Sequence, residues 1–503
     1  MSFLTELKKE ANYTTTLNGA KTHSSTGDSC LDLFALAGGM RYRKPADLRN
    51  MFTRAYIENP ELAMKLLFYI RDIRGGMGER KIFRILLRHT AFQWPESVKK
   101  NIHLIAEYGR FDDLLCLLKT PVQKQVVHLI SNQLQEDLAA VERREQGEHD
   151  APVSLLAKWL PSANASSCKT QETAKILLHA LGMDEKSYRK MLSRLRAHSC
   201  LTERYLTRGQ VEKIKYETVP AGAMLKYRSA FECKDEKRFH AYVDDVASGT
   251  KKMNSDTLFP YEILRPYFKN GYSGISNGYN VDGMDVLETL WNAQNVNVAE
   301  TNAISVIDTS GSMYWRYGNE PLPALISQAL GLRFAECCKG PFKNHVITFE
   351  SNPHLVELHG NTLKDKLMYL KTLPWGNSTN LEAVFELILN TAINSGATQE
   401  EMPKVLYIIS DMEFNCAVRN PNKTIYENAK EMFELYGYQL PVVVFHNVNS
   451  WETQTPVTAH TKGAALVSGA GVASFKEKFD GNVTPMSHML KVLNSKRYEE
   501  VHA

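Results

Sequence analysis

The chain has 503 residues, 43% hydrophobic and 23% charged, which is the composition of an ordinary globular protein with roughly two to four domains of about 100–200 residues each. No apolar stretch approaches the roughly 18 residues of a membrane span, and the polar N-terminus lacks the apolar core of a signal peptide. The eight cysteines are scattered without a C-x-x-C pair, so we expect reduced thiols and a cytoplasmic location. We also expect no membrane association and a monomer.

Charge is distributed unevenly along the chain. From Val296 onward, 17 Lys and Arg residues face 21 Asp and Glu residues, a net charge of −4. The preceding part therefore carries +8, since the whole chain carries +4. We expect a polyanionic partner to bind the N-terminal part and not the C-terminal part.

After an N-terminal arm (1–27), residues 28–295 have a helical pattern almost throughout. PELAMKLLFYIRDI (60–73) has a proline near its start and apolar residues at a 3.6-residue period, and 95–109 begins with proline and ends with glycine. Further helices are expected at 78–92, 121–142, 170–181, 184–197, 222–232 and 234–248. Many helices of similar length with short connections predict a stacked helical-repeat array, although no strict sequence period is present.

The glycine-rich stretch 268–284 has the composition of a linker or a crossover loop, and an α/β pattern follows over 296–503. Strands are expected at 302–308, 345–350, 404–410, 440–446 and 464–468. Helices are expected between them, near 321–338, 362–372, 380–394, 423–437 and 484–494. Continuous apolar strands alternating with helices predict a mostly parallel, doubly wound sheet, whose working residues follow the carboxyl ends of strands.

Two of these strand ends and one helix start carry oxygen-rich loops. Asp308, Ser310 and Ser312 follow the first strand, Thr379 precedes a helix, and Asp411 follows the strand 404–410. Two carboxylates and three hydroxyls form an all-oxygen set that suits a hard divalent cation, with Mg²⁺ favoured and Mn²⁺ or Ca²⁺ as alternatives. Zinc is disfavoured because no His or Cys falls in these loops.

The order Asp-x-Ser-x-Ser, then Thr, then Asp resembles the metal-ion-dependent adhesion site of the von Willebrand factor A domain. The resemblance covers roughly 296–495 and implies a metal left one ligand short, which an acidic group of a protein partner completes. Two alternatives stay open: Asp308 and Ser310 cap the following turn, or the motif persists in a domain that binds no metal. An aspartyl-nucleophile phosphatase is rejected because Ser310 stands where that chemistry needs a second carboxylate.

Basic residues of the N-terminal part fall in two stretches. RDIRGGMGERKIFRILLRH (71–89) places arginines at every fourth position of a helix, opposite its apolar face, and 193–231 interleaves Lys and Arg with aromatic residues. Such residues can contact phosphates and stack on unpaired bases, or they can simply form a solvated helix face. The candidate RNA-binding residues are Arg71, Arg74, Arg80, Arg84, Arg88, Arg194, Arg196, Arg204, Lys213, Lys215, Lys226 and Arg228.

A second resemblance covers nearly the whole chain. The run from YRKMLSRLR through PYEIL (188–264) is similar to the TROVE module of the Ro ribonucleoprotein family. STGDSCLDLFALAGGMR and RDIRGGMGERKIFR are closer to the uncharacterised DUF2828 type. Both groups join a helical-repeat ring to a C-terminal von Willebrand factor A domain. The Ro resemblance implies a HEAT-like ring that binds small structured or single-stranded RNA without catalysis, whereas the DUF2828 branch implies no activity.

The sequence thus favours a non-catalytic RNA-binding ring with a divalent-metal adhesion site. The alternative is a protein-interaction scaffold whose C-terminal domain recruits an acidic partner through the metal, without RNA. We further expect this domain to contact the first helices, near residues 30–60, and so to close the array into a ring.

Overall fold

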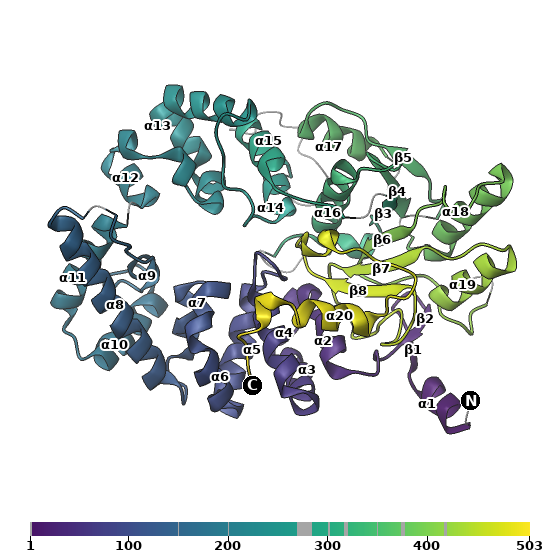
Figure 1. The fold of residues 1–503 in the computed structure, drawn as a ribbon, viewed down its shortest axis with the longest axis horizontal. Coiled ribbons are helices and arrows are strands. Elements are labelled where there is room, and N and C mark those ends of the chain that lie inside the picture. The colour runs from purple at the N-terminus through teal and green to yellow at the C-terminus, as the bar shows by residue number, and fades with distance from the viewer. Residues whose placement is uncertain are drawn as a thin grey trace.

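A computed structural model describes residues 3–148, 150–199, 201–268, 284–299, 302–315, 320–349, 351–373, 378–416 and 420–503. Most of the expected linker, residues 269–283, lies outside these ranges. The chain forms an arc of helices that begins and ends at one α/β domain (Figure 1). No helix within the described ranges is long and apolar enough to span a bilayer.

The helical array confirms the predicted architecture of the N-terminal part. Its helices are α2 (Ser29–Leu36), α3 (Pro45–Glu58), α4 (Pro60–Arg71), α5 (Arg80–Gln93), α6 (Pro95–Asn101), α7 (Ile105–Tyr108), α8 (Gln123–Glu145), α9 (Leu156–Trp159), α10 (Cys168–Leu181), α11 (Glu185–His198), α12 (Thr202–Arg208), α13 (Ala221–Ala247), α14 (Pro260–Leu264) and α15 (Met284–Ala293). Proline occupies the first turn of α3, α4 and α6, where its missing N–H costs no hydrogen bond.

Two helical predictions differ from the structure in detail. The segment 95–109 is not one helix, because a 3-10 turn, Ile102–Leu104, separates α6 from α7. The two helices expected at 222–232 and 234–248 are continuous as α13, but Asp235 interrupts it with a non-helical φ of −149°. The carboxylate of Asp235 accepts a hydrogen bond from the Tyr216 hydroxyl, 2.8 Å away, and this contact holds the kinked residue.

The α/β domain is built on a six-stranded sheet in the order β5-β4-β3-β6-β7-β8. The strands are β3 (Ala303–Asp308), β4 (His345–Phe349), β5 (Leu355–Glu357), β6 (Val405–Ser410), β7 (Val442–Asn447) and β8 (Ala464–Ser468). All neighbours are parallel except β4 and β5, so the sheet is doubly wound, as predicted, with an additional antiparallel edge strand. Every residue of β3, β6 and β7 is buried, which explains why these strands are continuously apolar.

Helices cover both faces of this sheet. They are α16 (Pro323–Cys337), α17 (Leu363–Thr372), α18 (Leu381–Ser395), α19 (Ile425–Leu435) and α20 (Pro485–Leu493). Ile304 and Val306 of β3 share a hydrophobic core with Phe385 of α18. Ile307, which points to the other face, shares a core with Leu325 and Leu332 of α16. The sheet is therefore the middle of three layers.

The first helices of the array dock on the carboxyl ends of β7 and β8. The Ser468 hydroxyl donates to the carbonyl of Phe34 (2.9 Å) and accepts from the N–H of Gly38 (3.0 Å). The Ser450 hydroxyl donates to the carbonyl of Leu36 (2.9 Å), and its N–H donates to the carbonyl of Gly39 (2.9 Å). These contacts confirm the expected docking of the α/β domain on the first helices.

The far end of the array also meets the α/β domain. Helices α14 and α15 pack against each other, and α14 packs against α16 (Figure 1). The Trp291 indole N–H of α15 donates to Glu336 of α16 at 2.7 Å. Because both ends of the array contact one domain, the ring is closed.

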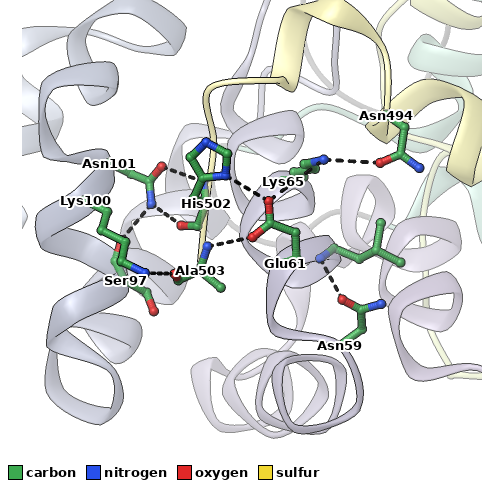
Figure 2. Close-up of polar contacts among 10 residues, drawn as sticks. Asn59, Glu61, Lys65, Ser97, Lys100, Asn101, Asn494, His502 and Ala503 are labelled. Carbon is green, nitrogen blue, oxygen red and sulfur yellow. Dashed lines mark hydrogen bonds and ion pairs between the residues drawn. The ribbon is translucent and has the colours of Figure 1, made fainter.

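The segment after α20 returns to the array and binds across α4 and α6. Figure 2 shows Glu61 of α4 accepting from the N–H of Ala503 (2.9 Å) and lying 3.1 Å from Nδ1 of His502. Asn101 of α6 accepts from the N–H of His502 at 3.0 Å. This segment adds a second attachment of the α/β domain to the same helices.

The N-terminal arm folds onto the α/β domain. After α1 (Phe3–Ala11), β1 (Tyr13–Thr15) and β2 (Lys21–His23) pair as an antiparallel hairpin. His23 exchanges backbone hydrogen bonds with Thr455 (3.0 and 2.8 Å), and Tyr13 donates to Glu427 at 3.1 Å. The hairpin of the predicted 1–27 arm therefore contacts the C-terminal domain.

Candidate metal centre and basic trough

The two predicted carboxylates lie at the switch point of the sheet. β3 and β6 are parallel neighbours, and the chain leaves them toward opposite sides of the sheet, since β3 is followed by β4 and β6 by β7. Asp308 is the last residue of β3, and Asp411 follows the last residue of β6. Ligands of open α/β sheets bind at such a point.

Asp308 is fully buried, and both its oxygens accept hydrogen bonds. The Ser310 N–H donates to one oxygen at 2.9 Å, and the Ser410 hydroxyl donates to the other at 2.5 Å. The hydroxyls of Ser310 and Ser312 lie 3.1 Å apart. The contact between the Ser310 N–H and Asp308 is the turn cap that the sequence pattern left open as an alternative to a metal site. This cap uses only the backbone of Ser310, so the hydroxyls of Ser310 and Ser312 remain beside the carboxylate.

Asp411 is 1% exposed and lies in a strained loop. Its oxygens accept from the N–H of Glu413 and from the indole N–H of Trp451, each at 3.2 Å. Met412 between them has φ of +66°, a left-handed backbone that side chains other than glycine rarely adopt. Such strain is typical of loops whose geometry serves a site.

Thr379 joins the same network from the start of α18. Its hydroxyl lies 2.8 Å from the carbonyl of Glu413 and 3.0 Å from Oδ1 of Asn415, and both can accept its proton. The loop after Asp411 therefore connects Thr379 to the two carboxylates.

The electrostatics of these loops fit a cation. Burial and the neighbouring Asp411 raise the pKa of Asp308 to about 7, and burial raises the pKa of Asp411, opposed by a hydrogen bond from Ser312. Within the described ranges, neither carboxylate has an ion-pair partner. The same ranges contain no cluster of three or more His, Cys, Asp or Glu side chains that could hold a metal ion. A cation here would need the hydroxyl oxygens as well as the carboxylates, which is a hard-ion site.

The predicted arginines of the first stretch turn out to brace the array. Arg71 is buried and donates to Asp113 at 2.7 Å, and Arg84 donates to the same carboxylate at 2.5 Å. Arg88 donates to the carbonyls of Cys116 and Leu118 at 2.8 and 2.9 Å. The expected stripe is therefore solvated only in part, because Arg84 and Arg88 are half-buried and bind residues 112–118, which sequence spacing does not reveal.

The remaining candidates are dispersed. Arg74, Arg80, Lys213, Lys215 and Lys226 are exposed, and the neighbouring Arg110 and Arg84 add to burial in lowering the pKa of Arg80. Arg194 pairs with Glu145 at 2.7 Å. Arg196 donates to the carbonyls of Ala157 and Leu160, Arg204 to Ser193 and Arg228 to Leu225.

Some of these residues line a basic trough along the array. One hollow of about 930 Å³ lies between α11 and α12, and another of about 890 Å³ lies between α5, α9 and α10. Both are lined by Ser162 and Arg196, so they adjoin. The charged residues of the trough are Arg84, Arg88, Lys158, Lys169, Lys186, Arg189, Lys190, Arg196, Arg204 and Arg208, with Asp112, Glu185 and Glu203.

The sequence reasoning missed six of these ten basic residues. Lys186, Arg189 and Lys190 occur at helical spacing in α11 and carry a signal that could have been found. Lys158, Lys169 and Arg208 lie on separate helices, so only the tertiary fold brings them to one surface. Trp159, which stacks against the Arg110 guanidinium at 3.9 Å, adds an aromatic ring to the trough.

Two family models match this chain, one in each of its two parts. Residues 16–127 and 165–303 match the family DUF2828, and residues 302–497 match DUF7788, each described as a domain of unknown function. An uncharacterized protein of Acanthamoeba polyphaga mimivirus is 29% identical, covering 96% of this chain and 87% of that protein. The crystal structure of the Deinococcus radiodurans Ro (RSR) protein is similar at a TM-score of 0.46 and 13% identity, covering 90% of this chain and 99% of that one. The helical ring of this chain is thus similar to the DUF2828 family, and the α/β domain that follows it is similar to DUF7788.

Proposed function

We propose that this protein is a non-catalytic, RNA-binding ring of the Ro type whose α/β domain holds a divalent cation, with Mg²⁺ favoured. The basic trough is the observation that carries the RNA part. Ten basic and three acidic side chains line two adjoining hollows, an imbalance far above that of the whole chain. Such a surface attracts a polyanion.

RNA suits the trough better than an acidic protein does. The basic groups follow a path over α5, α9, α10, α11 and α12, as a phosphate backbone requires, and Trp159 offers an aromatic surface along it. Trp159 lies beside two cations, Arg110 and Lys158, which can pair with phosphates near a base. We therefore expect binding to single-stranded or partly structured RNA with little sequence specificity.

The RNA prediction is tested by replacing two exposed lysines and one exposed arginine of the trough with glutamine. Lys186, Lys190 and Arg208 are exposed and have no ion-pair partner among the described residues, so their replacement by Gln should leave the fold intact. Each lost phosphate contact on a single strand lowers the slope of log affinity against log salt by about 0.7. We expect the triple variant to bind a 20-nucleotide oligouridylate more weakly, with a slope reduced by about 2.

A matched control removes the same charge elsewhere. Replacing Lys430, Lys478 and Lys496 of the α/β domain by Gln should leave affinity and slope nearly unchanged. Equal loss in both variants would indicate only long-range attraction, and the trough would not be the site. Absence of RNA binding by wild type would favour the protein-interaction scaffold, in which the metal recruits an acidic partner.

The proposed metal site consists of five residues whose loops are joined by hydrogen bonds: Asp308, Ser310, Ser312, Thr379 and Asp411. The cation would offset the repulsion between two buried carboxylates. Mg²⁺ or Mn²⁺ bound only to the folded state should raise the melting temperature of wild type by mass action. Asp308→Ala should abolish this rise. Equal melting shifts in wild type and Asp308→Ala would contradict the site.

A further inference from the structure

The tip of the N-terminal hairpin lies directly on the metal loops. The side-chain amide of Asn18 donates to the Thr379 hydroxyl at 3.1 Å and to the carbonyl of Glu413 at 2.6 Å. The N–H of Leu17 donates to the buried Glu413 carboxylate at 2.8 Å, and the Thr16 hydroxyl donates to the carbonyl of Phe414 at 2.7 Å. The tip therefore binds two parts of the predicted metal site. One is the loop after Asp411, and the other is the hydroxyl of Thr379.

The Thr379 hydroxyl has limited capacity for partners. It offers one proton and two lone pairs. Its proton is directed to Glu413 or Asn415, and Asn18 takes one lone pair, which leaves one for a cation. A Mg²⁺ ion about 2.1 Å from this oxygen would lie within about 5 Å of the Asn18 amide nitrogen, whose hydrogens carry positive charge.

We propose that residues Thr16–Gly19 are an intramolecular cap of the metal site. Asn18 occupies the approach to Thr379 that an acidic group of a partner would use. This inference rests on the metal site proposed above. Its consequence is that a carboxylate ligand of the metal must displace the cap, so the chain itself restricts access to its metal.

The cap is built so that its tip can move while its base stays. At the base, the backbone of His23 is paired with that of Thr455. At the tip, the strands of the hairpin are only three residues long, and the Leu17 side chain is 66% exposed. Lifting Leu17–Gly19 alone would therefore expose little additional apolar surface and would break a few hydrogen bonds, whereas Thr16 and Ala20 on either side are buried and stay in place.

The experiment compares two substitutions at Asn18, with Mn²⁺ binding measured by calorimetry on the full chain. Asn18→Ala removes the amide dipole and frees a lone pair of Thr379, so affinity should rise about fivefold, the worth of one net hydrogen bond. Asn18→Asp places a carboxylate at the same position and supplies the missing acidic ligand in cis. Its affinity should rise at least about tenfold, because a charged group then faces the cation.

Asn12→Asp is the matched control. It makes the same chemical change in the same arm, but Asn12 contacts Ser24 and Ser25 and not the metal loops. It should bind Mn²⁺ as wild type does. Adding Asp308→Ala to Asn18→Asp should abolish the gain, which would place the new carboxylate at this site.

The outcomes separate the cap from the metal site. If wild type binds Mn²⁺ and loses it on Asp308→Ala, while Asn18→Asp behaves like Asn12→Asp, the metal site stands and the cap is wrong. If Asn18→Ala binds Mn²⁺ no better than wild type, the native amide does not restrict the site and the cap is overturned, even where the new carboxylate of Asn18→Asp raises affinity. If no variant binds, both proposals are overturned.

Discussion

Arg497→Ala should lower the free energy of unfolding by about 3–5 kcal/mol, because it leaves a buried carboxylate without its charged partner. Asp72 at the end of α4 is fully buried, and the guanidinium of Arg497 donates to both its oxygens. The Tyr498 hydroxyl donates to the same carboxylate at 3.1 Å, so this buried group joins Glu61 and Asn101 in anchoring the C-terminal segment to the array. Urea denaturation followed by tryptophan fluorescence measures the loss.

Asn494→Ala is the control for this prediction. Asn494 also links the two parts, since it accepts from Lys65 of α4 at 3.2 Å, but this contact is exposed (Figure 2). Its loss should cost less than about 1 kcal/mol. A double variant, Asp72→Asn with Arg497→Met, should recover much of the stability, because it removes the buried charge together with its partner. Equal stability of Arg497→Ala and Asn494→Ala would show that the ion pair does not hold the ring.

The pattern of apolar residues predicted most helices and strands, because apolar residues occupy the buried positions and each kind of element buries its residues at its own spacing. Continuous apolar runs identified β3, β6 and β7, whose residues are all buried. β5 was not predicted because Leu355–Glu357 has three residues, of which only Val356 is buried, too short for a pattern. The break between α6 and α7 also left no signal, since its residues suit a helix.

The meeting of Asp308 and Asp411 at one edge of the sheet was predictable from sequence because both residues follow recognisable strands. The surroundings of these two residues were not. Asn18 and Trp451 reach Thr379 and Asp411 from distant parts of the chain, and only the fold brings them there. The partners of Arg71 and Arg84 likewise come from another segment, so the spacing of these arginines gave no sign of their ion pairs with Asp113.

Gly38→Ala should destabilise the closed ring by about 3 kcal/mol or more, although it replaces glycine in a helical turn. A Cβ atom on Gly38 would lie 2.3 Å from the nitrogen of Gly469 and 2.4 Å from the carbonyl carbon of Ser468. Both atoms belong to the backbone after β8, which cannot move aside as a side chain can. Overpacking of this kind costs about 1–3 kcal/mol in ordinary cores, and a clash with backbone lies at the upper end.

Gly222→Ala tests whether the loss at Gly38 arises from this close approach. Gly222 lies in α13, and a Cβ there would have no neighbour within 4 Å, so alanine should stabilise the protein by about 0.5–1 kcal/mol through helix propensity. The same substitution should thus have opposite signs at the two positions. If Gly38→Ala matches Gly222→Ala in stability, the close docking of the first helices on β8 does not contribute to closing the ring.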